Sequence, residues 1–188
     1  MKIGIDIDGV ILDSETAFKV SAELYSLDVL GEDKMLDNST SRFEERYSWT
    51  KEQREVWHQK YLPIEAEKVN FMPGAIEVIK RLKNMGHELV IITARGGLCP
   101  RMKDIALEQF KKVGLKFDDY HFVVCDKAKL CTEINIELMI DDDYNNCINI
   151  ANEGIMALYF RDVKMKKINR ENVIEVNNWG EIYKYLKK

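Results

Sequence analysis

The spacing of hydrophobic positions changes at about residue 73 of the chain. From there on, short apolar runs alternate with segments in which apolar residues recur every three or four positions. The runs are typical of strands buried on both faces, and they lie at residues 88–94, 121–125, 137–141 and 155–160. The segments between them favour helices at residues 75–86, 101–113, 126–133 and 145–153. This alternation predicts a parallel β-sheet covered by helices.

The first residues of the chain predict one more strand of the same sheet. Ile3, Ile5 and Ile7 form an apolar stretch that ends in Asp6 and Asp8. With this strand, we expect a doubly wound, Rossmann-like α/β fold of about five parallel strands. Residues 179–188 favour a terminal helix.

Residues 14–72 interrupt this pattern between the first strand and the rest of the sheet. They contain no clear strand, but residues 14–27 and 50–61 favour helices. Thr50 and Gln53 have the spacing of a capping box at the start of the second helix. We therefore expect a core domain made of residues 1–13 and 73–188, with a small helical cap domain of residues 14–72 inserted after the first strand.

Composition excludes several functional classes. A chain of 188 residues with 46% hydrophobic and 32% charged residues is typical of a soluble globular protein, and its net charge of -4 argues against a nucleic-acid polymer as partner. No run of 18 apolar residues and no leader-like segment is evident, so we expect no membrane span and a cytoplasmic location. The four cysteines and three histidines lack metal-ligand spacing, which favours reduced thiols over a zinc site. Whether the chain forms a homodimer stays open.

Polar residues follow most of the predicted strands, where each strand ends. In a doubly wound sheet the carboxyl ends of the strands lie along one edge, and ligands bind there. The residues at these ends are mostly acids, joined by one hydroxyl group and two cationic groups: Asp6, Asp8, Thr93, Arg95, Asp126, Lys127, Asp141, Asp142 and Asp143.

The mutual repulsion of the carboxylates in such a cluster must be compensated. Repulsion between two carboxylates about 4 Å apart is roughly 4 kcal/mol at an effective dielectric constant near 20. A few carboxylate ligands, with water and substrate completing the coordination, favour Mg²⁺ over zinc or a closed calcium site. One of the three consecutive aspartates at 141–143 is also expected to cap the helix that follows.

The same residues suit a phosphate site. Thr93 and nearby main-chain amides can donate hydrogen bonds to phosphate oxygens, and Lys127 can supply positive charge. One aspartate can act as a nucleophile and form an aspartyl-phosphate, while a second acts as general acid and base.

Four short motifs resemble those of phosphatases in the haloacid dehalogenase superfamily. They are DIDGV at 6–10, IITAR at 91–95, Lys127 in DKAKLC, and IDDD at 140–143. The resemblance implies that Asp6 is the nucleophile, that Asp8 is the general acid and base, and that Lys127 holds both the nucleophile and the phosphate. Lys129 competes with Lys127 for this last role.

The resemblance also implies a substrate and metal site. Thr93 would bind the phosphate, with Ala94 and Arg95 beside it at the substrate. Arg95 is expected either to contact substrate or to pair with an acid of the cluster. Mg²⁺ would be bound by Asp6, by the main-chain oxygen of Asp8 and by Asp141, with Asp142 as a ligand or a neighbouring group.

Within the superfamily the chain is most similar to the cytosolic-type 5'(3')-deoxyribonucleotidases and their bacterial relatives. The similarity rests on ITAR, on the helical insertion, and on the run formed by Asp141, Asp142 and Asn146. It implies a Mg²⁺-dependent phosphomonoesterase acting on nucleoside monophosphates. The alternative within the superfamily is a phosphatase for another small phosphate ester, such as a sugar phosphate.

The insertion is rich in aromatic residues, any of which could stack on a substrate ring. We expect most of them to form the insertion's own core, and we take Phe18 and Trp49 as candidate substrate contacts. The full set is Phe18, Tyr25, Phe43, Tyr47, Trp49, Trp57 and Tyr61.

A receiver domain that accepts a phosphoryl group is the main alternative from another class, because it also combines acids, Thr, Lys and Mg²⁺. Its accepting aspartate lies on a middle strand, where this chain has Thr93 and Lys127, and the long insertion also argues against it. A non-catalytic phosphate-binding relative is the third alternative.

Overall fold

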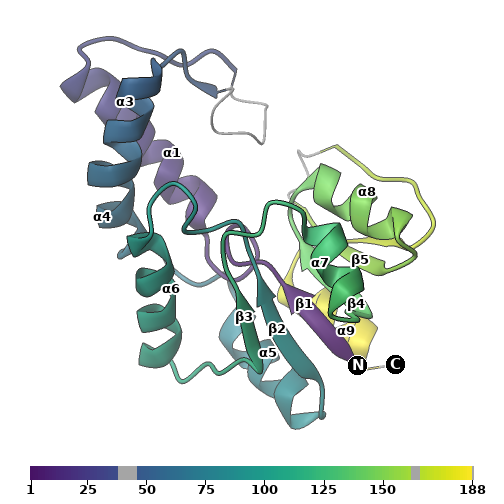
Figure 1. The fold of residues 1–188 in the computed structure, drawn as a ribbon. Coiled ribbons are helices and arrows are strands. Elements are labelled where there is room, and N and C mark those ends of the chain that lie inside the picture. The colour runs from purple at the N-terminus through teal and green to yellow at the C-terminus, as the bar shows by residue number, and fades with distance from the viewer. Residues whose placement is uncertain (38–45, 162–165, 188) are drawn as a thin grey trace.

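The computed structural model describes residues 1–37, 46–161 and 166–187. Its centre is a six-stranded sheet in the order β3-β2-β1-β4-β5-β6, in which every neighbouring pair is parallel (Figure 1). This order confirms the doubly wound prediction. The strands are β1 (Lys2–Ile5), β2 (Glu88–Ile92), β3 (Asp119–His121), β4 (Leu138–Asp141), β5 (Met156–Phe160) and β6 (Val173–Val176).

Helices cover both faces of the sheet, because successive side chains of each strand point to opposite sides. Leu89 and Ile91 of β2 pack in the larger core, together with residues of α5 (Ala75–Asn84), α6 (Arg101–Lys112) and α9 (Trp179–Leu186). Val90 and Ile92 of the same strand pack on the other face against α7 (Lys127–Glu133) and α8 (Tyr144–Asn152). All five helices were predicted.

Two features of the sheet differ from the sequence prediction. The strand expected at 121–125 is shorter and earlier, at Asp119–His121, because Val123 has a φ of 61°, which no strand residue adopts. The sixth strand, Val173–Val176, was not predicted. It lies at the edge of the sheet, where its first three residues are only half-buried, so it lacks the continuous apolar pattern of the inner strands.

The insertion is helical, as expected. It contains α1 (Ser14–Leu24), the π-helical turn η1 (Tyr25–Val29), α3 (Lys51–Val56), the π-helical turn η2 (Trp57–Tyr61) and α4 (Leu62–Ala66). Thr50 and Gln53 form the predicted capping box, with main-chain N–H to side-chain oxygen distances of 2.9 and 3.2 Å. The second helical segment continues past residue 61 into α4. Pro63 does not end it, because this proline lies in the first turn of α4, where a missing N–H is tolerated.

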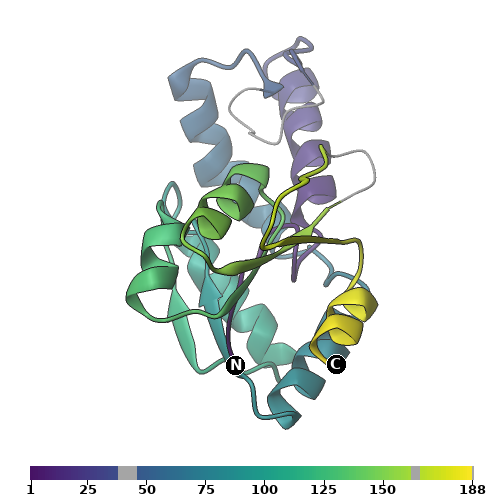
Figure 2. The same ribbon diagram turned by 90° about the vertical axis from the view of Figure 1, so that its right-hand side faces the viewer.

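The aromatic residues of the insertion mostly form its core, as predicted. Tyr25, Tyr47, Trp49 and Trp57 are all at most 5% exposed, and they pack together with Met102 and Ile105 of α6. Phe43 lies outside the described residues. The insertion helices stand above the sheet and its covering helices (Figure 2).

The chain leaves the core and returns to it along two adjacent segments. Leu12 and Phe71 form an antiparallel bridge. Beside it, the N–H of Asp13 donates to the Asn70 carbonyl at 2.9 Å, and the N–H of Met72 donates to the Ile11 carbonyl at 2.8 Å. The two chain segments that link the insertion to the core are therefore paired with each other.

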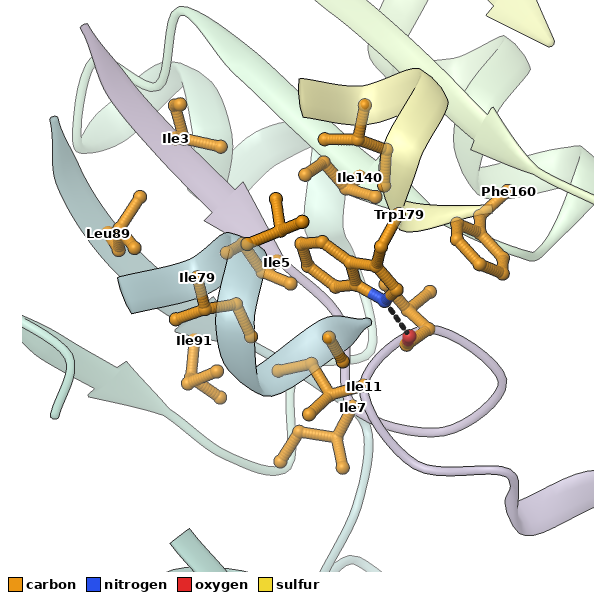
Figure 3. Close-up of a cluster of buried hydrophobic side chains, with 14 of the residues drawn as sticks. Ile3, Ile5, Ile7, Ile11, Ile79, Leu89, Ile91, Ile140, Phe160 and Trp179 are labelled. Atoms are coloured by element: carbon orange, nitrogen blue, oxygen red, sulfur yellow. Dashed lines mark hydrogen bonds between the residues drawn. The ribbon is translucent and has the colours of Figure 1, made fainter. Parts of the chain in front are cut away.

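The loop after β1 is fixed by the last helix of the chain. The N–H groups of Ile11 and Leu12 both donate to the Ile7 carbonyl at 2.9 Å, which folds the loop back on itself. The indole Nε1 of Trp179, at the start of α9, donates to the Val10 carbonyl at 2.8 Å (Figure 3). Because Trp179 is fully buried in the larger core, it anchors this loop to the core.

Other expectations concern thiols and membrane spans. All four cysteines are free thiols, and Cys125 is the exposed one. Among the helices that the structure describes, none is long and apolar enough to cross a membrane.

Candidate active site

The carboxyl edge of the sheet brings together nearly all of the predicted site residues. Asp6 and Asp8 follow β1, Thr93 to Arg95 follow β2, Lys127 opens α7, and Asp141 ends β4. All of them except Asp141 line a cavity of about 530 Å³. Its lining combines these strand ends with the start of the insertion: Asp6, Asp8, Ser14, Glu15, Phe18, Arg46, Thr93, Ala94, Arg95, Lys127 and Asp142.

Three carboxylates converge on one point beside this cavity. Asp6, Asp141 and Asp142 each offer an oxygen atom, and these atoms lie within 4.8 Å of one another. Lys127, whose side chain is 5% exposed, reaches into the cluster. Its Nζ lies 3.0 Å from Asp6 Oδ1 and 2.6 Å from Asp141 Oδ2. The lysine therefore joins the predicted nucleophile to the end of β4.

The cluster joins three carboxylates to one lysine, so it holds more negative charge than Lys127 balances. Burial raises the pKa of Asp6 to about 6; the attraction of Lys127 opposes this rise, and repulsion from Asp141 and Asp8 adds to it. Burial and repulsion from Asp6 and Asp141 raise the pKa of Asp142 well above its ordinary value. Burial alone would lower the pKa of Lys127, but the attraction of Asp141 and Asp6 raises it. Hard oxygen ligands carrying uncompensated negative charge fit a divalent cation such as Mg²⁺.

Asp141 is held in place by the start of α8. Its Oδ1 accepts hydrogen bonds from the main-chain N–H of Asp143 at 2.9 Å and from Asn146 Nδ2 at 3.2 Å. Asp143 in turn caps α8, because its Oδ1 accepts from the main-chain N–H of Asn146 at 2.8 Å. This confirms that one of the three consecutive aspartates is a helix cap, and it leaves the other two beside Asp6.

Asp8 is paired with Arg95. The guanidinium donates from Nε to Asp8 Oδ2 at 3.0 Å and from Nη2 to Oδ1 at 2.5 Å. Partial burial would raise the pKa of Asp8, but the charge and hydrogen bonds of Arg95 and a hydrogen bond with Ser14 hold it below its ordinary value. Of the two roles predicted for Arg95, the structure shows the pairing with an acid.

Thr93 is fixed by its neighbours at the end of β2. It is 1% exposed, and its main-chain N–H donates to the His121 carbonyl at 3.0 Å. Its Oγ1 accepts from the main-chain N–H of Arg95 at 3.2 Å. The hydroxyl group thus lies at the cavity wall with its proton available to another acceptor, as phosphate binding requires.

Two predicted residues lie away from the cavity. Trp49 is buried inside the insertion, where its Nε1 donates to Ser26 Oγ at 3.0 Å, so it does not line the cavity as a substrate contact would. The side chain of Lys129 is 71% exposed and lies 3.9 Å from Glu133. Of the two candidate lysines, the structure therefore places Lys127 at the carboxylates. Phe18 does line the cavity.

The sequence interpretation missed three residues that the insertion contributes. Ser14 and Glu15 open α1, and Arg46 comes from the segment before α3. Arg46 Nη2 lies 2.6 Å from Glu15 Oε1. No motif marks any of them, since each is an ordinary polar residue of a helical region and becomes part of the site only through the fold.

Gly9 allows Asp142 to approach the cluster, which leads to a prediction. A Cβ at Gly9 would lie 2.0 Å from Asp142 Oδ2, and Gly9 has a φ of +72°. We expect Gly9→Ala to displace Asp142, to lower the free energy of unfolding by more than the roughly 1–2 kcal/mol cost of the left-handed backbone alone, and to weaken Mg²⁺ binding. Urea denaturation and calorimetric Mg²⁺ titration measure these effects.

Gly86→Ala is the matched control for this experiment. Gly86 has a similar φ of +85°, but a Cβ there would meet no atom within 4 Å. Gly86→Ala should lower the free energy of unfolding by the backbone cost alone and leave Mg²⁺ binding unchanged. Equal effects of both variants on Mg²⁺ binding would show that the contact between Gly9 and Asp142 has no part in it.

Comparison with known proteins shows the fold. No protein-family model matches the chain, and no curated protein matches its sequence. A haloacid dehalogenase-like hydrolase from Streptococcus pneumoniae matches in structure with a TM-score of 0.72 at 16% identity, over 98% of this chain and 97% of that one. A β-phosphoglucomutase from Clostridium difficile gives 0.66 at 14% identity, over 99% and 95% of the two chains.

A third structure has the same architecture. It is described as a predicted phosphoglycolate phosphatase from Haemophilus somnus, and it matches with a TM-score of 0.64 at 15% identity, over 98% of this chain and 97% of that one. The chain thus has the α/β fold of haloacid dehalogenase-like hydrolases over nearly its whole length.

Proposed function

We propose that this protein is a Mg²⁺-dependent phosphomonoesterase that works through an aspartyl-phosphate on Asp6. The observation that carries the proposal is the convergence of Asp6, Asp141 and Asp142 around Lys127, at the edge where Thr93 and Asp8 also lie. Haloacid dehalogenase-like neighbours with the same fold support it. Asp6, Asp141 and Asp142 are the candidate side-chain ligands of Mg²⁺, and the motif resemblance adds the Asp8 main-chain oxygen. When bound, the ion would neutralise these acids and polarise a phosphoryl oxygen.

In the first half of the reaction, a carboxylate oxygen of Asp6 attacks phosphorus, and the bond from phosphorus to the ester oxygen breaks. Lys127 holds the nucleophile and offsets charge on the phosphoryl group, while Thr93 donates a hydrogen bond to it. Asp8 gives a proton to the departing oxygen, and the alcohol is released.

In the second half, water attacks the phosphorus of the aspartyl-phosphate. Asp8, now a carboxylate, takes a proton from this water. The bond between Asp6 and phosphorus breaks, which restores the Asp6 carboxylate and releases inorganic phosphate. Asp8 thus regains the proton that the next cycle requires, against the preference for its ionised form that Arg95 creates in the free protein.

For the substrate, a nucleoside monophosphate is the first candidate. Besides the motif resemblance, a second cavity of about 310 Å³ supports it, since Asp8 and Arg95 line this cavity together with apolar side chains that suit a flat ring: Phe18, Trp57, Leu62 and Met102. A sugar phosphate or another small phosphate ester is the second candidate, which the names of the phosphoglycolate phosphatase and β-phosphoglucomutase neighbours favour.

Phosphate release from a panel of esters tests the proposal. Deoxyribonucleotides, ribonucleotides, sugar phosphates and phosphoglycolate are each incubated with the protein and Mg²⁺. We expect hydrolysis that a chelator abolishes and added Mg²⁺ restores, with the highest kcat/KM on a nucleotide. Full activity in chelator would contradict the metal requirement. A stable phosphoprotein formed from acetyl phosphate, without turnover, would instead favour a receiver-like function.

A further inference from the structure

Arg95 holds Asp8 by a two-point contact. Its Nε and Nη2 bind Oδ2 and Oδ1 of the same carboxylate, so both oxygens are engaged side by side. We call this pair of hydrogen bonds the fork. A planar guanidinium can make such a contact, whereas a lysine ammonium binds as a point charge. The fork therefore fixes the direction of the Asp8 carboxylate and not merely its charge.

The base of the fork is rigid. The Arg95 side chain is 1% exposed. Its main-chain N–H donates to Thr93 Oγ1 at 3.2 Å, and its carbonyl accepts from the N–H of Val123 at 3.3 Å. The guanidinium thus projects from a fixed point at the end of β2 into the wall shared by the two cavities that contain Asp8.

The fork also reaches the insertion. Arg95 Nη2 lies 3.3 Å from the Oγ of Ser14, which is 1% exposed and is the first residue of α1. Asp8 itself is less enclosed, with a side chain that is 36% exposed. Because it lies among other acids, an unheld Asp8 carboxylate would turn away from them toward solvent. Arg95 opposes this motion.

A carboxylate held in this way can still take part in proton transfer. Each of its oxygens has two acceptor positions, and the fork occupies one position on each. Ser14 hydrogen-bonds to the same carboxylate, which leaves one position that can carry the proton for a leaving group in the cavity. The orientation of the Asp8 carboxylate relative to that group then depends on Arg95.

We propose that Arg95 is a positioning residue, which aims the Asp8 carboxylate at the leaving oxygen of the substrate through its two-point contact. The inference rests on the proposed phosphomonoesterase function. It predicts an effect that depends on the leaving group, because an alcohol departs only with a proton, whereas 4-nitrophenolate is stable enough to depart without one. Without the fork, the hydrolysis of alkyl esters should therefore slow more than the hydrolysis of the aryl ester.

The test compares kcat/KM on two esters, since this constant reports only the steps up to departure of the leaving group. The esters are the best alkyl phosphate of the panel and 4-nitrophenyl phosphate. For Arg95→Met we expect a loss of about 100-fold on the alkyl ester and of no more than about threefold on the aryl ester. Arg95→Lys, which keeps the charge but cannot form the fork, should show the same selectivity with a smaller loss.

Two further variants and two measurements of the fold make the result decisive. Asp8→Asn should show the same selectivity with a larger loss on the alkyl ester. Arg101→Met should leave both constants unchanged, because Arg101 pairs with Glu67 in an exposed contact between α6 and the insertion. Circular dichroism and thermal melting of each variant identify any loss of fold, and Arg95→Lys then serves in place of a misfolded Arg95→Met.

The outcomes separate this inference from the function on which it rests. An equal loss on both esters, or no loss on either, overturns the positioning role while the wild-type protein still hydrolyses both. If the wild-type protein hydrolyses neither of these esters nor acetyl phosphate in the presence of Mg²⁺, the proposed function fails, and the role of Arg95 fails with it.

Discussion

Replacing Asp6 by Asn should abolish phosphate-ester hydrolysis while leaving the fold intact. Asparagine cannot form the aspartyl-phosphate, so we expect kcat to fall on the order of 10⁴-fold or more, the scale of losing a covalent nucleophile. The raised pKa of Asp6, about 6, means that its ionised form is disfavoured in the folded protein. Above this pKa its charge therefore lowers the stability of the fold, because the unfolded chain ionises more readily.

Because the charge of Asp6 destabilises the fold at neutral pH, the Asp6→Asn experiment has stability as a second readout. At neutral pH and without Mg²⁺, the free energy of unfolding of Asp6→Asn should equal or exceed that of the wild type. Added Mg²⁺ should stabilise the wild type more than the variant, because one of three converging carboxylates is gone. Urea denaturation with and without Mg²⁺ measures both effects.

Asp126→Asn is the matched control for this replacement. Asp126 caps α7 by accepting from the N–H of Lys129 at 3.0 Å, and asparagine caps helices equally well. The same chemical change, one residue from Lys127, should leave activity and stability nearly unchanged. Substantial turnover by Asp6→Asn would refute the assignment of the nucleophile.

Replacing Lys127 by Met should have the largest effect on stability. Lys127 lies within 3.0 Å of the Asp6 and Asp141 carboxylates, and Asp141 is fully buried. Removing one partner from a buried ion pair leaves uncompensated charge and costs about 3–5 kcal/mol. We expect a loss of this size in urea denaturation without Mg²⁺, a partial recovery when Mg²⁺ is added, and no measurable turnover.

Lys129→Met is the comparison for this variant, two residues along the same helix. Its side chain is 71% exposed, and its contact with Glu133 is 3.9 Å long. Such surface replacements change stability by no more than about 0.5 kcal/mol, and activity should be retained. Reversed effects of the two variants would assign the active-site lysine to Lys129 instead.

The parts of the fold that the sequence predicted are those with a repeating local signal. The inner strands read as continuous apolar runs because both faces of the sheet are buried, as Val90 and Ile91 illustrate on opposite faces of β2. The strand ends could be predicted for the same reason: a charged residue that interrupts such a run marks the edge. This is how Asp6 and Asp141 could be placed together from residues 135 positions apart.

The parts that were missed depend on contacts that no local pattern encodes. The residues of HFVVC favour a strand, but Val123 adopts a left-handed φ, and the N–H of Val124 donates to the Thr93 carbonyl at 2.9 Å. Tertiary contacts thus override local propensity there. The edge strand β6 lacks a clear signal because three of its four residues are only partly buried.

In the insertion, too, the local sequence does not identify which residues line the site. Phe18 and Trp49 are both aromatic residues of a helical region, and the sequence gives no reason to separate them. The structure shows that Phe18 lines the cavity and that Trp49 packs against Tyr25 and Tyr47 in the insertion's core. Similarly, the pairing of Arg95 with Asp8 joins residues 87 positions apart, and the sequence alone leaves two alternatives for Arg95.

The hydrogen bond from Trp179 to the Val10 carbonyl has a consequence for how the protein is made. The motif that carries Asp6 and Asp8 is synthesised well before α9, whose indole anchors the loop that follows the motif. A nascent chain that has not yet released α9 from the ribosome lacks this anchor. The loop after β1 is therefore anchored only once α9 has left the ribosome, so a shorter nascent chain cannot yet hold the loop that follows Asp8 in its finished form.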